Sequence, residues 1–302
     1  NFNVNFNSSI SNVNANSSNS NVNSNSSNSN IDLNSSKSNK DGFVFLVIGG
    51  SRFENHPFAK YVVSLQESGD DSFGKHFCGG SILSKKLILT AAHCVMSSIA
   101  APSSIRIVAG TPRRLLHTNN TQEMEVEQII VHPQYYSQLV KNDIALIKLK
   151  DELDIDDDFV SVLPLTDEEP TIGQECTIIG WGTILEAGPL ADDIVSGDVS
   201  ITHHEYCEKF GGYHRDVKLC ISNPKNYEVI ACHGDSGGPL ICDNMVVGVA
   251  SYGVKFGYPT MRIVYTNAYY FRDWISQNSV CGQMKIVSFW LTFQAIILAL
   301  LL

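Results

Sequence analysis

Three short strings that lie far apart in the chain constrain its fold more than any other feature. They are Thr90–Cys94, Asp143–Leu146 and Gly234–Pro239, and they supply a histidine, an aspartate and a serine. A serine hydroxyl is a poor nucleophile at neutral pH unless a base takes its proton, and that base needs a group that orients it. A fold that uses all three must therefore bring three distant segments together.

Each of these residues suits one part in such chemistry. His93 is the candidate base, because an imidazole titrates near pH ~6.5 and can accept and return a proton. Asp143 is the candidate carboxylate that orients His93, and Ser236 is the candidate nucleophile. Gly234 permits a tight turn that aims its own N–H and that of Ser236 at one point, as an oxyanion hole requires. Singly, they are also typical of a core histidine, a strand-entry aspartate and a turn serine, so their combination carries the hypothesis.

The order His93, Asp143, Ser236 and the strings around them resemble the trypsin/chymotrypsin family of serine endopeptidases, from about Val47 to about Cys281. Subtilisins and α/β-hydrolases carry the same groups in other orders. The resemblance implies an all-β fold of two six-stranded antiparallel β-barrels with a C-terminal helix and an active site in the cleft between the barrels. It also implies hydrolysis of protein substrates through an acyl-enzyme, and protein inhibitors as further partners.

Composition narrows the other classes of function. The net charge of −10 argues against a nucleic-acid partner, because nucleic acids select basic surfaces. The eight histidines other than His93 show no spacing typical of metal ligands, so we expect neither a metal nor a cofactor.

Eight cysteines suit an oxidising compartment, so we expect a protein that is secreted or attached to the outer cell surface. In relatives, the cysteine equivalent to Cys232 bridges to the far wall of the specificity pocket, where this chain has Phe256. Cys232 is therefore expected to be a free thiol or to be bonded unusually, and a bridge to Cys281 stays open. The resemblance implies three other disulfides: Cys78–Cys94, Cys176–Cys242 and Cys207–Cys220.

From Tyr61 onward, short runs rich in Val and Ile between polar turns indicate strands. The apolar spacing of Phe271, Trp274 and Ile275 favours a helix near the end of this region. We predict helices over His203–Phe210 and Ala268–Asn278. We predict strands over Tyr61–Gln66, Lys86–Thr90, Ile105–Ala109, Val126–Val131, Ile144–Leu149, Cys176–Gly180, Val199–Ile201 and Met245–Ser251.

Residues 1–46 read as a disordered segment and propeptide that precedes a protease domain over 47–281. Residues 7–42 repeat loosely with a period of nine and are almost all Asn and Ser, so they cannot bury enough apolar area to order. The chain begins with Asn1 rather than Met, which suggests a fragment or a processed product. The repeat either carries glycans or arose without a selected role. The candidate glycosylation sites are Asn7, Asn16, Asn25, Asn34 and Asn119.

The tail over 282–302 is a candidate membrane attachment. Its apolar part, Ile286–Leu302, would span roughly 26 Å as a helix, slightly less than a hydrocarbon core of about 30 Å. No Lys or Arg follows it, which favours a GPI-attachment signal over a membrane-spanning helix. A tail-anchored helix and a tail with neither role stay open.

Activation is expected at Val47, the first residue of a Val-Ile-Gly-Gly string. In the family, cleavage before such a string creates an ammonium that pairs with the aspartate preceding the nucleophile, here Asp235. The residue before Val47 is Leu46, whereas most relatives have Arg or Lys. We therefore expect the zymogen to be cut by a chymotrypsin-like or elastase-like protease, or by the enzyme itself.

The specificity pocket is expected to be apolar. Six residues before the nucleophile, where trypsins carry Asp, this chain has Ile230, which cannot pair with a substrate Arg or Lys. Gly253, near Ser251, leaves the pocket entrance open, whereas Ile263 replaces a pocket glycine and narrows the interior. We therefore predict cleavage after medium or small apolar residues such as Leu, Val and Ala.

Two other functions remain in view. A catalytically weak homologue acting as a regulatory or binding module would fit the non-basic activation site, the absent pocket disulfide and Ile263. A surface adhesion protein that works through its repeat would leave the three strings unexplained.

Overall fold

The computed structural model describes residues 51–52, 56–69, 74–96, 101–183, 188–209, 211–223, 231, 233–254 and 262–279. The repeat, the expected activation site at Val47 and the apolar tail lie outside these residues. Among the residues described, each helix is too short or too polar to cross a membrane.

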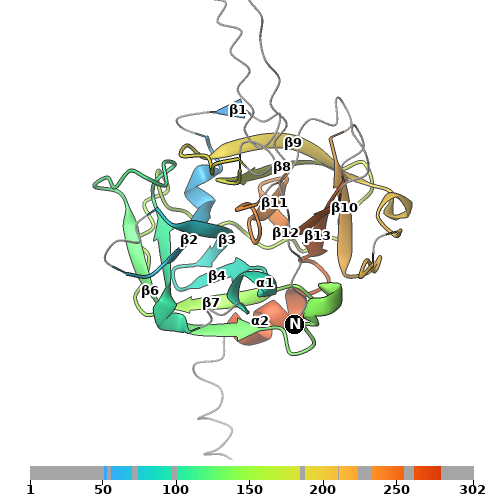
Figure 1. Ribbon diagram of the computed structural model, residues 1–302, viewed down its shortest axis with the longest axis horizontal. Coiled ribbons are helices and arrows are strands. Elements are labelled where there is room, and N and C mark those ends of the chain that lie inside the picture. The colour runs from blue at the N-terminus through green and yellow to red at the C-terminus, as the bar shows by residue number, and fades with distance from the viewer. Residues whose placement is uncertain are drawn as a thin grey trace, which may run out of the picture. The chain divides into compact units, whose positions relative to one another are not determined.

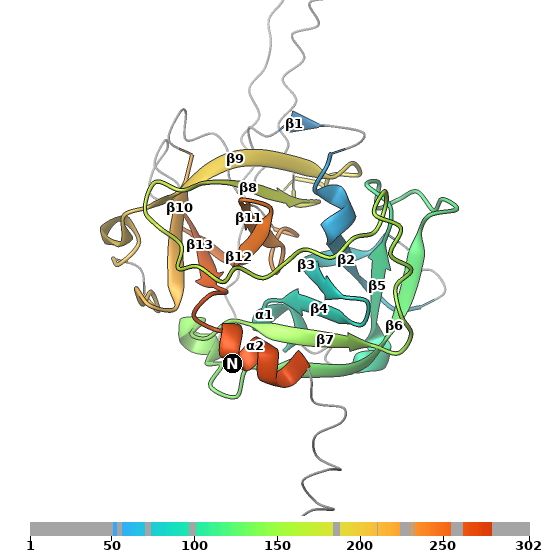
Figure 2. The same ribbon diagram turned by 180° about the vertical axis from the view of Figure 1, so that it is seen from behind.

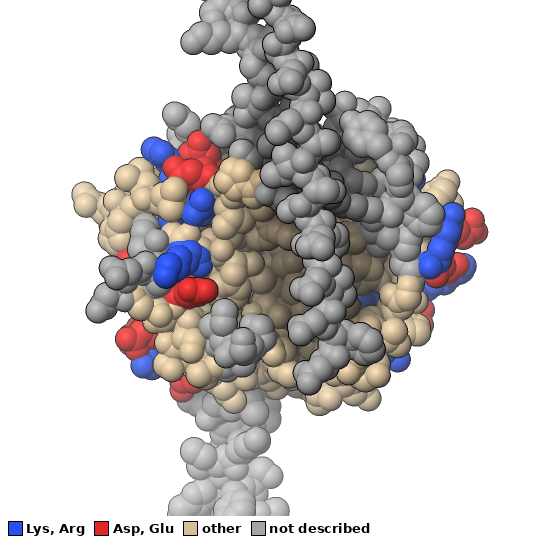
Figure 3. Space-filling model, in the orientation of Figure 1, with Lys and Arg blue, Asp and Glu red and all other residues tan. Residues whose placement is uncertain are grey.

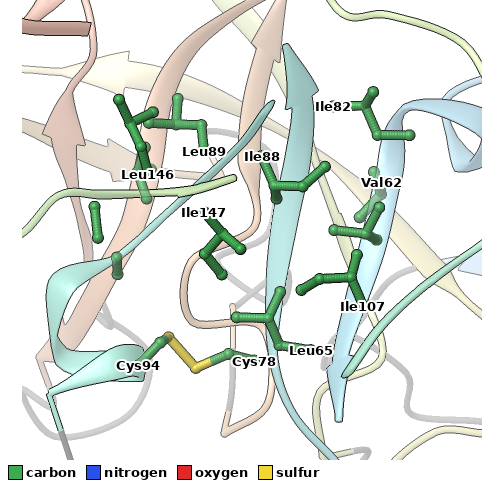
Figure 4. Packing of buried hydrophobic residues seen from close by; sticks show 14 of the residues in the cluster. Val62, Leu65, Cys78, Ile82, Ile88, Leu89, Cys94, Ile107, Leu146 and Ile147 are labelled. Atoms are coloured by element: carbon green, nitrogen blue, oxygen red, sulfur yellow. A yellow bond between two sulfur atoms is a disulfide. The ribbon is translucent and has the colours of Figure 1, made fainter. Parts of the chain in front are cut away.

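The first half of this region forms a closed antiparallel barrel with the strand order β2-β3-β4-β7-β6-β5 (Figure 1). Its interior is filled by branched aliphatic side chains with no exposed surface, such as Ile82, Ile88 and Leu146 (Figure 4). Such side chains favour the pleated, half-buried surface of a sheet. The strands are β2 (Val62–Glu67), β3 (His76–Ser84), β4 (Leu87–Thr90), β5 (Ile105–Ala109), β6 (Gln122–Val131) and β7 (Ala145–Leu149).

The second half closes in the same way, in the order β9-β10-β13-β12-β11-β8, with β8 pairing back to β9. A short β1 (Ser51–Arg52) adds to the outer edge of β9. The predicted fold of two six-stranded antiparallel barrels is therefore confirmed. The strands are β8 (Glu175–Gly180), β9 (Val195–Thr202), β10 (Lys218–Ser222), β11 (Pro239–Cys242), β12 (Met245–Val254) and β13 (Arg262–Asn267).

The α-helices in the described region are α1 (Ala92–Val95) and α2 (Arg272–Ser279). The helix predicted over Ala268–Asn278 exists but begins later, at Arg272. Both views place α1 between the two barrels (Figures 1 and 2). Four short 3₁₀ turns complete the described helical structure: η1 (Ala59–Tyr61), η2 (Pro102–Ser104), η3 (Ser137–Leu139) and η4 (His204–Tyr206).

The prediction of a helix over His203–Phe210 is wrong, because among its described residues, 203–209, only the three of η4 are helical. Cys207, directly after η4, is bonded to Cys220 in β10 and directs the chain toward the sheet. Gly212 then has a φ of +83°, which no helix accommodates.

The three predicted disulfides are present: Cys78–Cys94, Cys176–Cys242 and Cys207–Cys220. The first joins β3 to α1 beneath the interior of the first barrel (Figure 4). Cys232 and Cys281 lie outside the described residues. The disulfide near α1 matters most for the site, because α1 carries His93.

Candidate active site

His93 and Asp143 form a two-point contact. His93 Nδ1 lies 2.8 Å from Asp143 Oδ2, and the His93 backbone N–H donates to Asp143 Oδ1 over 2.9 Å. A carboxylate only accepts hydrogen bonds, so Nδ1 carries the proton and Nε2 is left as the basic nitrogen. The His93 side chain is 29% exposed, so a substrate can reach that nitrogen.

Asp143 is held in its ionised form by its neighbours. Its side chain has no exposed surface, and burial alone would raise its pKa. The hydrogen bond and charge of His93, the charge of Lys218 and the hydrogen bond of Ser251 together outweigh burial and hold the pKa of this carboxyl below its usual value. Ser251 Oγ donates to Asp143 Oδ2 over 2.5 Å, and Thr266 Oγ1 donates to the Asp143 carbonyl over 2.8 Å.

The loop that carries Ser236 belongs to the second barrel but packs on the first. The Gly79 N–H, in β3, donates to the Ser236 carbonyl over 2.8 Å. Gly237 has a φ of +79°, and a Cβ added there would lie 2.2 Å from Thr90 Oγ1. Only glycine allows this approach. Since Thr90 lies just before α1, this packing brings the Ser236 loop to the segment that carries His93.

Within the described residues, Ser236 Oγ and His93 Nε2 do not form a hydrogen bond. His93 Nε2 has a weak contact with Cys94 Sγ at 3.8 Å. Such catalytic hydrogen bonds are often long without substrate and tighten in the substrate complex. The His93 imidazole is thus oriented by the Asp143 carboxylate, and its Nε2 has no hydrogen bond to Ser236 Oγ in this structure.

A buried hydrogen-bond chain braces the turn at Gly234, whose φ is +101°. His76 Nε2 donates to the Gly234 carbonyl over 2.8 Å, and His76 Nδ1 lies 2.8 Å from Ser64 Oγ. Burial lowers the pKa of His76 to about 4, so this imidazole is neutral at physiological pH. These hydrogen bonds from Ser64 through His76 to Gly234 hold the backbone whose N–H groups, at Gly234 and Ser236, would bind an oxyanion.

Asp235 lies against two glycines of the second barrel. It is 4% exposed, and its Oδ1 accepts a hydrogen bond from the Gly182 N–H over 2.8 Å. A Cβ on Gly180 or Gly182 would lie 2.3 or 2.2 Å from an Asp235 oxygen. The Gly180-Trp181-Gly182 string is thus shaped to hold a buried carboxylate, which agrees with the position expected of an activation partner.

The expected pocket residues are only partly described. Gly253 and Ile263 are register partners in β12 and β13, and Ser251 lies two residues before Gly253. A Cβ added to Gly253 would meet nothing within 4 Å, whereas Ile263 is 3% exposed. Ile230 lies outside the described residues. The space at Gly253 is thus open and Ile263 is buried, and the roles of both in a specificity pocket stay predictions.

Sequence reasoning missed the residues that support the site from behind. These lie in strands or turns with no motif around them, and no spacing marked them as neighbours of the three strings. The Gly-Trp-Gly string could have indicated a close backbone approach. The missed residues are Ser64, His76, Gly180, Gly182, Lys218 and Thr266.

The surface of the described region is uneven in charge. On the face seen in Figure 3, Lys, Arg, Asp and Glu side chains lie toward the edges, and the uncharged surface between them is hollowed.

Comparison with known proteins assigns the family. The profile of the Trypsin family matches residues 47–275. Hypodermin-A of Hypoderma lineatum is 32% identical over 237 residues, which cover 77% of this chain and 87% of the relative. Trypsin eta of Drosophila melanogaster is 34% identical, with 77% and 88% covered, and chymase of Rattus norvegicus is 30% identical, with 76% and 90% covered. With this match and the two-barrel fold, the chain belongs to the trypsin family of serine endopeptidases.

Proposed function

We propose that Ser236, His93 and Asp143 hydrolyse peptide bonds of protein substrates after apolar residues. The observation that carries the proposal is the two-point contact of Asp143 with His93 beside the loop of Ser236. His93 Nε2 removes the proton of Ser236 Oγ as that oxygen attacks the scissile carbonyl. The N–H groups of Gly234 and Ser236 bind the oxyanion, and losing one such donor typically costs ~2.7–4 kcal/mol of barrier.

The same groups complete the acylation step and then carry out the deacylation step. The protonated His93 gives its proton to the departing amine, which leaves an ester between Ser236 and the acyl part of the substrate. His93 then takes a proton from water, and the resulting hydroxide equivalent attacks the ester. Ser236 leaves with the proton from His93, so the free enzyme is restored.

The preference for apolar residues is supported by Ile263 and Gly253, together with Ile230 in the sequence. An isoleucine side chain offers no countercharge, so a substrate Arg or Lys would be stranded. The narrowed interior favours Leu, Val and Ala over Phe and Tyr.

Zymogen activation before Val47 and an extracellular site of action complete the proposal. The buried Asp235 supports activation, because a new ammonium at Val47 would supply it with a countercharge. Three disulfides support an oxidising compartment, and the exposed Asn119 is available for glycosylation. The tail over 282–302 would attach the enzyme to a membrane, either as a GPI-attachment signal or as a helix.

A fluorophosphonate label tests the proposal. The activated protein is expected to take up the label at Ser236, and the Ser236→Ala variant is expected to take up none. The labelled fraction then gives the number of active sites for assays with chromogenic peptides. Turnover should be highest after Leu, Val or Ala.

Two results would count against the proposal in different ways. Absence of labelling in an activated and folded protein would favour the regulatory homologue. Labelling together with preferred turnover after Arg would keep the enzyme and overturn its specificity.

A further inference from the structure

Lys218, the first residue of β10, is a cation enclosed behind the catalytic pair. Its side chain has no exposed surface, and its Nζ donates to Ser251 Oγ over 2.8 Å and to Thr266 Oγ1 over 3.1 Å. Nζ also lies 5.4 Å from the centre of the Tyr252 ring. Burying an ammonium costs free energy unless charge and hydrogen bonds compensate it.

The two hydroxyls that Lys218 contacts both lead to Asp143. An ammonium can only donate, so each hydroxyl accepts from Lys218 and must turn its own hydrogen elsewhere. Ser251 Oγ then donates to Asp143 Oδ2, and Thr266 Oγ1 donates to the Asp143 carbonyl. Every donor in this network therefore points toward the residue that orients His93.

We propose that Lys218 is a positioning residue for catalysis, whose ammonium holds Ser251 and Thr266 as donors to Asp143 and thereby fixes the carboxylate that orients His93. This inference rests on the proposed function. Without the ammonium, either hydroxyl could rotate its hydrogen away from Asp143. Asp143 would then no longer be held by hydrogen bonds from both hydroxyls.

The charge of Lys218 also acts on the site. Burial lowers the pKa of Lys218 to about 8, although Asp143 opposes that shift, so the ammonium persists at neutral pH. The tyrosines that face it stay neutral there: burial raises the pKa of Tyr252 to about 12 and that of Tyr213 further. The charged or chargeable groups around the network are thus Lys218, Asp143 and His93. Removing the cation leaves a more negative site, and activity that is lost on acidification should therefore be lost at a higher pH.

The test is Lys218→Met, assayed against pH after the active sites have been counted with the fluorophosphonate label. We expect kcat to fall by about tenfold with little change in KM, less than the loss of a general base would cause. We expect the acid limb of the kcat/KM profile to move upward by about half to one pH unit, the scale of one nearby charge. Thermal stability should fall, because Lys218→Met removes one partner of a buried charge pair and leaves the Asp143 carboxylate buried.

Matched variants separate the charge from other effects. Lys218→Gln keeps a donor without the charge and should show the same shift of the acid limb with a smaller loss of kcat. Lys150→Met removes an equal charge from an exposed side chain and should leave the profile unchanged. A merely structural lysine would also give a lower melting temperature, but with an unmoved acid limb in both Lys218 variants. That result, with labelling of the wild type intact, overturns this inference alone, whereas an unlabelled wild type overturns the proposed function with it.

Discussion

His76 is a buried side chain that makes the stability of the folded protein depend on pH. Its imidazole bridges Ser64 and the Gly234 carbonyl, and burial lowers its pKa to about 4, from an ordinary 6.5. Between these two values the unfolded chain binds a proton that the folded protein does not. Stability contributed by His76 is therefore full above pH 6.5 and is lost as the pH falls toward 4.

The wild type should lose about 3 kcal/mol of unfolding free energy through this group over that window. In His76→Gln, the free energy of unfolding should change less between pH 4 and 6.5, as measured by urea unfolding at closely spaced pH values. His117→Gln, at a mostly exposed histidine, is the control and should keep the wild-type slope. Equal slopes for the wild type and His76→Gln would contradict the assignment.

At the scale of elements, the runs rich in Val and Ile predicted eight strands of the described region and missed β1, β3, β10, β11 and β13. The pattern located Ile105–Ala109 to the residue, but β3 escaped it because Gly79 and Gly80 interrupt the run. A Cβ on Gly80 would lie 2.7 Å from Ile88 Cγ2, and one on Gly79 would lie 3.1 Å from Gly238 Cα. These glycines serve contacts between distant segments, and a local pattern carries no information about such contacts.

The same distinction applies to the candidate site. The three strings identify His93, Asp143 and Ser236 because their local sequence is distinctive. Lys218 and Thr266 reach Asp143 only through the register of β10 with β13, which pairs those two positions. A single sequence does not determine that register, so the support behind the carboxylate appears only in the folded chain.

The disulfides allow an element-scale prediction. Replacing Cys78 and Cys94 by Ala opens a loop of 16 residues and should cost about 3 kcal/mol of stability. Replacing Cys176 and Cys242 opens a loop of 66 residues and should cost about 4 kcal/mol. The first pair should nevertheless lose more kcat, because it anchors the helix of His93. Urea unfolding and assays on counted active sites measure both, and parallel losses of stability and kcat would argue against this anchoring.

At the scale of the whole molecule, activation and release of the N-terminal segment should be one event. Residues 1–46 contain no cysteine, so no disulfide from this stretch ties it to the protease domain after cleavage before Val47. N-terminal sequencing of the active form should begin at Val47. A non-reducing gel should show the loss of the segment without added thiol. A different first residue in the fully active enzyme would refute the cleavage site.

The packing of the Ser236 loop on Thr90 has a consequence for biosynthesis. His93 lies beside the first barrel and Ser236 in a loop of the second, so under the proposed function a nascent chain that has completed only its first barrel could not hydrolyse peptide bonds. Proteolytic activity would arise only after the last strands of the second barrel have docked. Completion of the second barrel would thus be a condition for activity separate from cleavage before Val47.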